Sequence, residues 1–130
     1  GCIEHYGSTS ALVRNVKEAV ISGEIKGIEA GKVDGRLIFK EVAAGNDTVK
    51  KYVDEWISYI SATLVGLVHI FNPEMIILGG GVSRQKELFV DKVRERVLHG
   101  VMPNFAIGLT VEAAKLGNDA GIIGAVRFIK

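Results

Sequence analysis

The chain has 130 residues, of which 48% are hydrophobic and 24% charged, a size and composition that suit one globular core rather than two. A net charge of +1 and a pI near 8.1 exclude the strong electrostatic field on which non-specific binding to nucleic acids or anionic membranes depends. One cysteine excludes an internal disulfide, and neither an export leader nor a run of about 18 apolar residues is visible, so we expect a cytoplasmic protein.

The first part of the chain predicts two helices. Residues 1–7 are expected to form a loop. Apolar residues at steps of three and four then predict a helix that begins with a hydroxyl cap among residues 8–10 and ends at Gly23. After a glycine-rich loop with at most one helical turn, Asp34 is expected to cap a shorter helix that Gly45 closes.

The longest helix is predicted next. Asn46 or Asp47 opens it, and Asn72 and Pro73 end it, because proline lacks an amide hydrogen and its ring displaces the preceding residue from the helical region. Its apolar residues recur at steps of three and four and form a stripe wide enough to cover a sheet. They are Val49, Val53, Trp56, Ile57, Ile60, Leu64, Leu67, Val68 and Phe71.

A short apolar run, a triple glycine and a helix pattern follow the proline in that order. The run, residues 75–78, predicts a parallel strand that is buried on both faces. Gly79, Gly80 and Gly81 predict a turn, and Ser83 is expected to cap the helix that follows. Ligands of open α/β sheets bind beyond the carboxyl ends of the strands, where residues without a Cβ let the backbone approach them. This turn is therefore the leading candidate site.

The last part of the chain predicts a second strand, parallel to the first, and a closing helix. The helix after the triple glycine runs to about Leu98, and acidic and basic residues interleave over residues 84–96 as on an ordinary solvated face. Alternation over residues 107–112 predicts a strand with two unlike faces. A turn at residues 116–119 leads into a helix over residues 119–129. Its small residues, which favour close packing against a neighbouring element, are Gly121, Gly124 and Ala125.

The predicted sheet is incomplete. Two strands flanked by several helices leave exposed backbone edges, and such a sheet is rarely stable alone. We therefore expect further strands to come from a preceding segment, from another chain or from both, which makes residues 1–130 the latter part of a larger protein.

Three segments of the chain together resemble parts of one known family. Residues 1–8 read Gly-Cys-Ile-Glu-His-Tyr-Gly-Ser, residues 72–83 contain the triple glycine, and residues 116–125 read Leu-Gly-Asn-Asp-Ala-Gly-Ile-Ile-Gly-Ala. In this order they are similar to the end of the cysteine-rich signature, the nucleotide-binding segment and the final turn and helix of the ROK family. That family comprises bacterial sugar kinases and sugar-responsive repressors of the hexokinase, Hsp70 and actin superfamily. The resemblance implies an α/β fold of the ribonuclease H-like (actin-like ATPase) type, with residues 1–130 as the C-terminal portion of a kinase lobe.

The resemblance implies that the parent protein transfers phosphate from ATP, with Mg²⁺, to a hexose hydroxyl. The general-base aspartate of the family lies upstream of Gly1, so this portion alone is expected to be inactive, because phosphoryl transfer depends on complete positioning of both substrates. Glu4 would accept hydrogen bonds from sugar hydroxyls, whereas without the motif it would be interpreted as a solvated acid in a loop. Family members are commonly homo-oligomers. A sugar-sensing lobe of a ROK repressor remains the alternative function.

By the same resemblance, Gly79, Gly80, Gly81 and Val82 would bind the adenosine of ATP, and residues 117–120 would help to place the closing helix. The residues alone also allow a tight turn that needs positive φ angles at one or two glycines. The segment matches neither the dinucleotide-binding fingerprint, since Arg84 replaces its third glycine, nor a P-loop.

Cys2 resembles the last of three cysteine ligands of a structural zinc in the family. A tetrahedral zinc site needs four ligands, so we expect no metal at Cys2 unless a partner contributes the others. His5 is interpreted as an ordinary surface histidine rather than a replacement ligand. His69 and His99 lie near predicted helix ends, where a cation is mildly favoured, and are assigned no chemistry.

Overall fold

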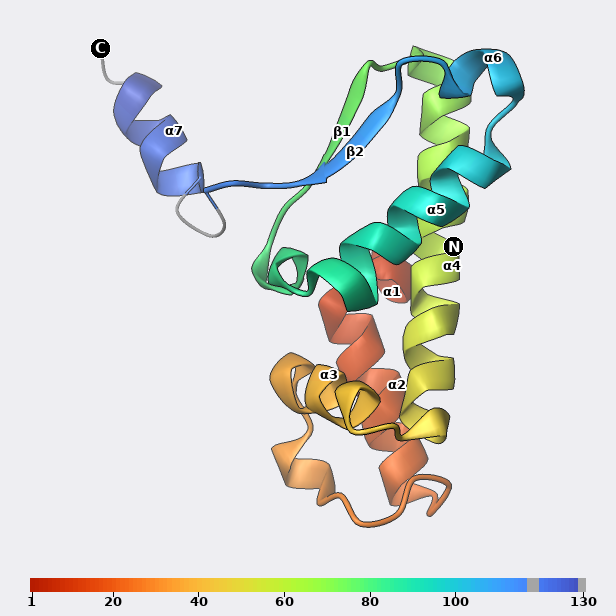
Figure 1. Cartoon of the computed structure of the whole chain (residues 1–130). Helices are drawn as coiled ribbons and strands as arrows, with labels where there is room; N and C mark the ends of the chain where they lie inside the picture. The colour runs from red at the N-terminus through yellow and green to blue at the C-terminus, as the bar shows by residue number, and fades with distance from the viewer. Residues whose placement is uncertain (117–119, 129–130) are drawn as a thin grey trace. The chain divides into compact units, whose positions relative to one another are not determined.

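The computed structural model describes residues 1–116 and 120–128, which form two compact units, Gly1–Gly66 and Leu67–Lys130 (Figure 1). Composition favoured one core, whereas each unit has its own cluster of buried apolar side chains. The long helix α4 (Asp47–Phe71) contributes to both units. Across the described residues, no helix combines the length and the hydrophobicity that crossing a membrane would require.

The first unit is helical, and side-chain caps fix where its helices begin. It contains α1 (Glu4–Gly7), α2 (Thr9–Ile21), the 3₁₀ turn η1 (Ala30–Lys32), α3 (Gly35–Ala43) and most of α4. The Ser8 side chain accepts a hydrogen bond from the amide of Ala11, and the Asp34 side chain accepts one from the amide of Leu37. The Asn46 side chain does the same at the start of α4. These three caps confirm the predicted helix starts.

The prediction of a loop over residues 1–7 is wrong at its second half. The backbone amides of Tyr6 and Gly7 both donate to the carbonyl of Ile3, at 3.0 and 2.7 Å, and close the short helix α1. Trp56 of α4 then holds the end of α1, because its indole Nε1 lies 3.0 Å from the carbonyl oxygens of both Gly7 and Ser8. The bonds come from a residue about 50 positions away, and no local pattern predicts them.

Apolar side chains from α2, α3 and α4 form the core of the first unit. Phe39 and Trp56 meet edge to face, with ring centroids 6.4 Å apart, a geometry that aromatic pairs prefer. The other buried members recur at helical spacing, as the sequence predicted. They are Ala11, Leu12, Val16, Ala19, Ile38, Val42, Val49, Val53 and Ile57. At the end of the predicted stripe of α4, however, Leu67 and Phe71 are 42% and 72% exposed.

The second unit contains the sheet. Its elements after α4 are β1 (Met75–Leu78), η2 (Gly81–Arg84), the single-turn π-helix η3 (Lys86–Val90), α5 (Asp91–Gly100), α6 (Pro103–Ala106), β2 (Thr110–Ala113) and α7 (Ala120–Phe128). The two strands are parallel, with Met75 opposite Thr110 and Leu78 opposite Ala113. The predicted strand–helix–strand unit is thus confirmed. As predicted, α4 stops before the proline, with Asn72 at a positive φ of 44°.

The second strand is shorter than its alternating pattern suggested. Pro103 begins the unpredicted helix α6, and Gly108 adopts a φ of +78°, so β2 starts only at Thr110 and Ile107 is 81% exposed. Proline suits the first turn of a helix because its missing amide hydrogen is not needed there.

The burial predicted for β1 is also not observed. Met75 and Ile77 on one face of the strand are 53% and 63% exposed, whereas Leu78 and the β2 residue Val111 are buried on the other face. In α7, no atom lies within 4 Å of a Cβ built on Gly124, and Ala125 is exposed, so the predicted close packing is absent at these two residues. The predicted turn at residues 117–119 lies outside the described residues.

Candidate nucleotide and sugar sites

The glycine turn follows directly from β1, as the sequence predicted. Gly80 has φ 88° and ψ 177°, a conformation that is essentially confined to glycine. Ser83 was expected to cap the next helix, but it lies within η2, and its hydroxyl donates to the carbonyl of Gly80 at 2.7 Å. The backbone amide of Ser83 donates to the same carbonyl at 3.2 Å. Ser83 therefore fixes the turn itself, and the helix after Gln85 begins without a side-chain cap.

The outer surface of this turn is open. A Cβ built on Gly79, Gly80 or Gly81 would meet no heavy atom within 4 Å. Only Gly80 has a φ that requires glycine, so the need for a tight turn does not account for Gly79 and Gly81. Val82 is half-buried, and its carbonyl accepts the amide of Gln85 at 2.9 Å. The exposed main chain of this candidate site is thus that of residues 79–81.

Glu4, the candidate sugar ligand, lies in the first turn of α1 in the first unit. It is exposed and lines a hollow of about 220 Å³ with the side chains of Ile3, Ser8, Ile60, Thr63 and Leu64 and with Gly7. Of the hydroxyls in that set, Ser8 already accepts the amide of Ala11 as the cap of α2, and Thr63 already donates to the carbonyl of Tyr59. The carboxylate of Glu4 is therefore the charged acceptor that this hollow offers to a polar ligand.

The cysteine and histidines do not assemble a metal site within the described residues. Cys2 is exposed, and its carbonyl accepts the backbone amide of His5, but no group of three potential ligands gathers there or elsewhere in residues 1–116 and 120–128. The residues present thus do not fit a tetrahedral zinc site. His69, which was assigned no chemistry, has a structural role: its Nε2 accepts the amide of Met102 at 3.1 Å, and its ring meets Phe105 edge to face.

The structure also brings out a residue that sequence reasoning dismissed. Arg94 was counted among the interleaved charges of a solvated helix face. Its side chain is only 30% exposed and contacts both its own helix and strand β2 through the guanidinium group. The charge pattern of the sequence could not predict the contact with β2, because its main acceptor is the backbone carbonyl of Val111.

Comparisons with known proteins agree on one family. The model of the ROK family matches residues 1–130. A glucokinase of Thermotoga maritima is 32% identical over 136 aligned residues, which cover 100% of this chain and 43% of the relative. A xylose repressor of Caldicellulosiruptor bescii is 29% identical over 133 residues, which cover 99% of this chain and 33% of the repressor.

The structural comparison agrees with the sequences. The crystal structure of a ROK family glucokinase from Streptomyces griseus, in complex with glucose and AMPPNP, matches with a TM-score of 0.81 and 30% identity, over 98% of this chain and 44% of that chain. The chain thus spans less than half the length of the relatives it matches. Its small parallel sheet and flanking helices have the fold of ROK sugar kinases, the actin-like ATPase fold. The chain belongs to the ROK family.

Proposed function

We propose that residues 1–130 are the C-terminal portion of an ATP-dependent sugar kinase that phosphorylates a hydroxyl of a hexose, with the nucleotide bound as its Mg²⁺ complex. The glucokinase relative and the Streptomyces griseus glucokinase, whose crystal contains glucose and AMPPNP, support this proposal. We expect the whole protein to act in the cytoplasm as a homo-oligomer. Zinc is not part of the proposal for this segment, because Cys2 provides only one of four ligands.

The open turn at residues 79–82 is the observation that carries the proposal. In it, Gly79, Gly80 and Gly81 present bare main chain, and Val82 follows, so the flat surface of an adenosine can lie against the backbone. Two of these glycines have no conformational need to be glycine, which is what a surface kept free of side chains for a ligand would show.

Glu4 takes the role of sugar ligand. An ionised carboxylate accepts several hydrogen bonds at once, and hydrogen bonds to charged acceptors are stronger than those to neutral ones. Phosphoryl transfer requires both substrates and a base to be positioned together. The 130-residue portion by itself is therefore expected to bind substrates weakly and to show no turnover.

The test uses the full-length protein that carries this chain, with ATP, Mg²⁺ and a panel of sugars. We expect turnover with at least one hexose, and we expect Gly81→Ala to raise the KM for ATP at least threefold while the KM for sugar stays within twofold. Gly31→Ala is the matched control, since Gly31 also lies in a 3₁₀ turn, η1, with no atom within 4 Å of its added Cβ. An ATP KM that is equal in both variants would remove the nucleotide assignment.

A sugar-sensing lobe of a repressor is the second candidate. The xylose repressor, which matches nearly all of this chain, favours it. Assays of sugar phosphorylation and of DNA binding on the full-length protein distinguish the two functions. Absence of turnover across the sugar panel, together with sugar-dependent release from DNA, would replace the kinase by the repressor.

A further inference from the structure

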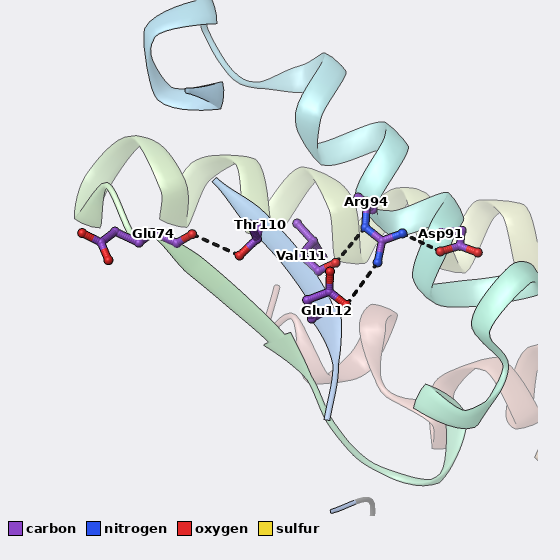
Figure 2. A network of polar contacts seen from close by, with 6 residues as sticks. All are labelled: Glu74, Asp91, Arg94, Thr110, Val111 and Glu112. Atoms are coloured by element: carbon purple, nitrogen blue, oxygen red, sulfur yellow. Dashed lines mark hydrogen bonds and ion pairs between the residues drawn. The ribbon is translucent and has the colours of Figure 1, made fainter. Parts of the chain in front are cut away.

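The guanidinium group of Arg94 makes three contacts, two of which connect helix α5 to strand β2 while the third, with Asp91, lies within α5 (Figure 2). Nε donates to the carbonyl of Val111 at 2.8 Å, and Nη1 donates to Oδ1 of Asp91 at 2.6 Å. Nη2 lies 3.6 Å from Oε2 of Glu112 and forms a longer ion pair. Because the guanidinium group is planar with fixed donor directions, these contacts together fix its orientation as well as its position.

The contact with Val111 uses the side of β2 that faces away from β1. The amides of Thr110 and Ala114 donate to the carbonyls of Glu74 and Leu78, at 3.0 and 2.9 Å, so alternate residues of β2 bond to the β1 side. Residues between them direct their backbone groups to the opposite side. Arg94 thus satisfies an edge carbonyl that would otherwise bond to water.

This arrangement anchors both ends of the glycine turn to the same strand. On one side of the turn, β1 is held to β2 by the backbone ladder from Met75 to Leu78. On the other side, the helical segment that follows the turn is held to β2 by Arg94, and Val93 of the same helix is buried within the unit. Burial of apolar side chains is non-directional, whereas the hydrogen bond from Arg94 to Val111 specifies one position of the helix along the strand.

We propose that Arg94 is a positioning residue for nucleotide binding: it sets the geometry of the turn at residues 79–85 by holding the helix after it to β2. The inference rests on the proposed kinase function. Arg94 acts through the turn, and its effect is expected on the KM for ATP. The KM for sugar is expected to stay unchanged, because Glu4 lies in the other unit.

The test compares three variants in the full-length protein. Arg94→Met keeps an unbranched apolar stem and removes the guanidinium group with all three of its contacts. We expect the KM for ATP to rise about tenfold, a change of the size expected when the charge-assisted hydrogen bond to Val111 is lost. Arg94→Lys keeps the positive charge but lacks the several fixed donors of the guanidinium group. We expect its KM for ATP to lie between those of the wild type and Arg94→Met. Glu112→Gln leaves the bond to Val111 intact and is expected to stay within twofold of the wild type.

Lys32→Met is the control, because it removes an exposed ion pair with Glu29 in the first unit. A merely structural role of Arg94 predicts equal losses for ATP and sugar, and that result, or an unchanged KM for ATP, would overturn the proposal.

A second measurement keeps the inference separate from the proposed function. Without nucleotide, amide hydrogen exchange at Ser83 and Gln85, which donate within the turn, is expected to accelerate severalfold in Arg94→Met. If the wild type phosphorylates no sugar, the kinase proposal fails, and the exchange result then decides whether Arg94 positions the turn. Unchanged exchange at both amides would overturn the inference.

Discussion

Gly80 provides the sharpest test of the turn. Its φ of 88° and ψ of 177° lie in a region that residues with a Cβ almost never occupy. No heavy atom lies within 4 Å of a Cβ built there, so the cost of Gly80→Ala arises from its own backbone and not from a clash with neighbours. Holding alanine in such a conformation costs about 1–3 kcal/mol.

Gly81 is the matched comparison, one residue further along. It begins the 3₁₀ turn η2, has no positive φ and likewise has free space around an added Cβ. There, Gly→Ala reduces the conformational freedom of the unfolded chain and is expected to stabilise the protein by about 0.4–1 kcal/mol. The two neighbouring substitutions should therefore change the free energy of unfolding in opposite directions.

The assay is chemical denaturation of the full-length protein and of both variants. Shifts of the midpoint at constant slope report the change in the free energy of unfolding. If Gly80→Ala left the free energy of unfolding unchanged, or raised it as Gly81→Ala is expected to do, the turn would have relaxed to an ordinary conformation and the positive φ would not be required. In the kinase assay, Gly80→Ala is also expected to raise the KM for ATP more than the KM for sugar.

Three further substitutions test individual contacts by denaturation. Ser61→Ala is expected to stabilise the protein by about 1 kcal/mol, because the buried hydroxyl of Ser61 has no hydrogen-bond partner among the described residues; a loss of stability would reveal one. His69→Ala removes the acceptor of the Met102 amide and is expected to cost about 1 kcal/mol, with partial recovery in His69→Gln. The hydrogen bond to Glu24 raises the pKa of Tyr52 above its ordinary value of 10.0. This bond therefore stabilises the folded protein fully below pH 10.0, and the stabilisation disappears as the pH rises through the raised pKa. In Tyr52→Phe, the free energy of unfolding should fall less steeply at alkaline pH than in the wild type. An unchanged pH profile would show that the bond between Tyr52 and Glu24 is not the cause.

Local rules predicted the parts of the fold that local contacts determine. Ser8, Asp34 and Asn46 cap the helices that their positions indicated, because a cap needs only an amide two or three residues away. The same rule failed at Ser83. There the next helix begins only after Gln85, so Ser83 lies too early to cap it, and the Ser83 hydroxyl bonds to the carbonyl of Gly80 instead.

The predicted burial of β1 failed for a different reason. Four consecutive apolar residues are typical of a strand covered on both faces, yet Met75 and Ile77 are largely exposed. The pattern depends on what covers the sheet, and the chain spans less than half the length of its relatives. The exposed face fits the proposal that further elements of a whole kinase lie over it.

The candidate site likewise contains a part that the sequence could predict and a part that it could not. The glycine turn could be predicted because each of its parts, an apolar run, three glycines and a helix, is adjacent in sequence. Arg94 could not, because only its contact with Asp91 follows the helical spacing of three residues, and its main acceptor is a backbone carbonyl 17 residues away. Every residue has a backbone carbonyl, so the sequence does not indicate which of them accepts this hydrogen bond. A candidate site whose residues are adjacent in sequence can thus be predicted from side-chain type and order, whereas a side chain that bonds to a distant backbone carbonyl emerges only from the structure.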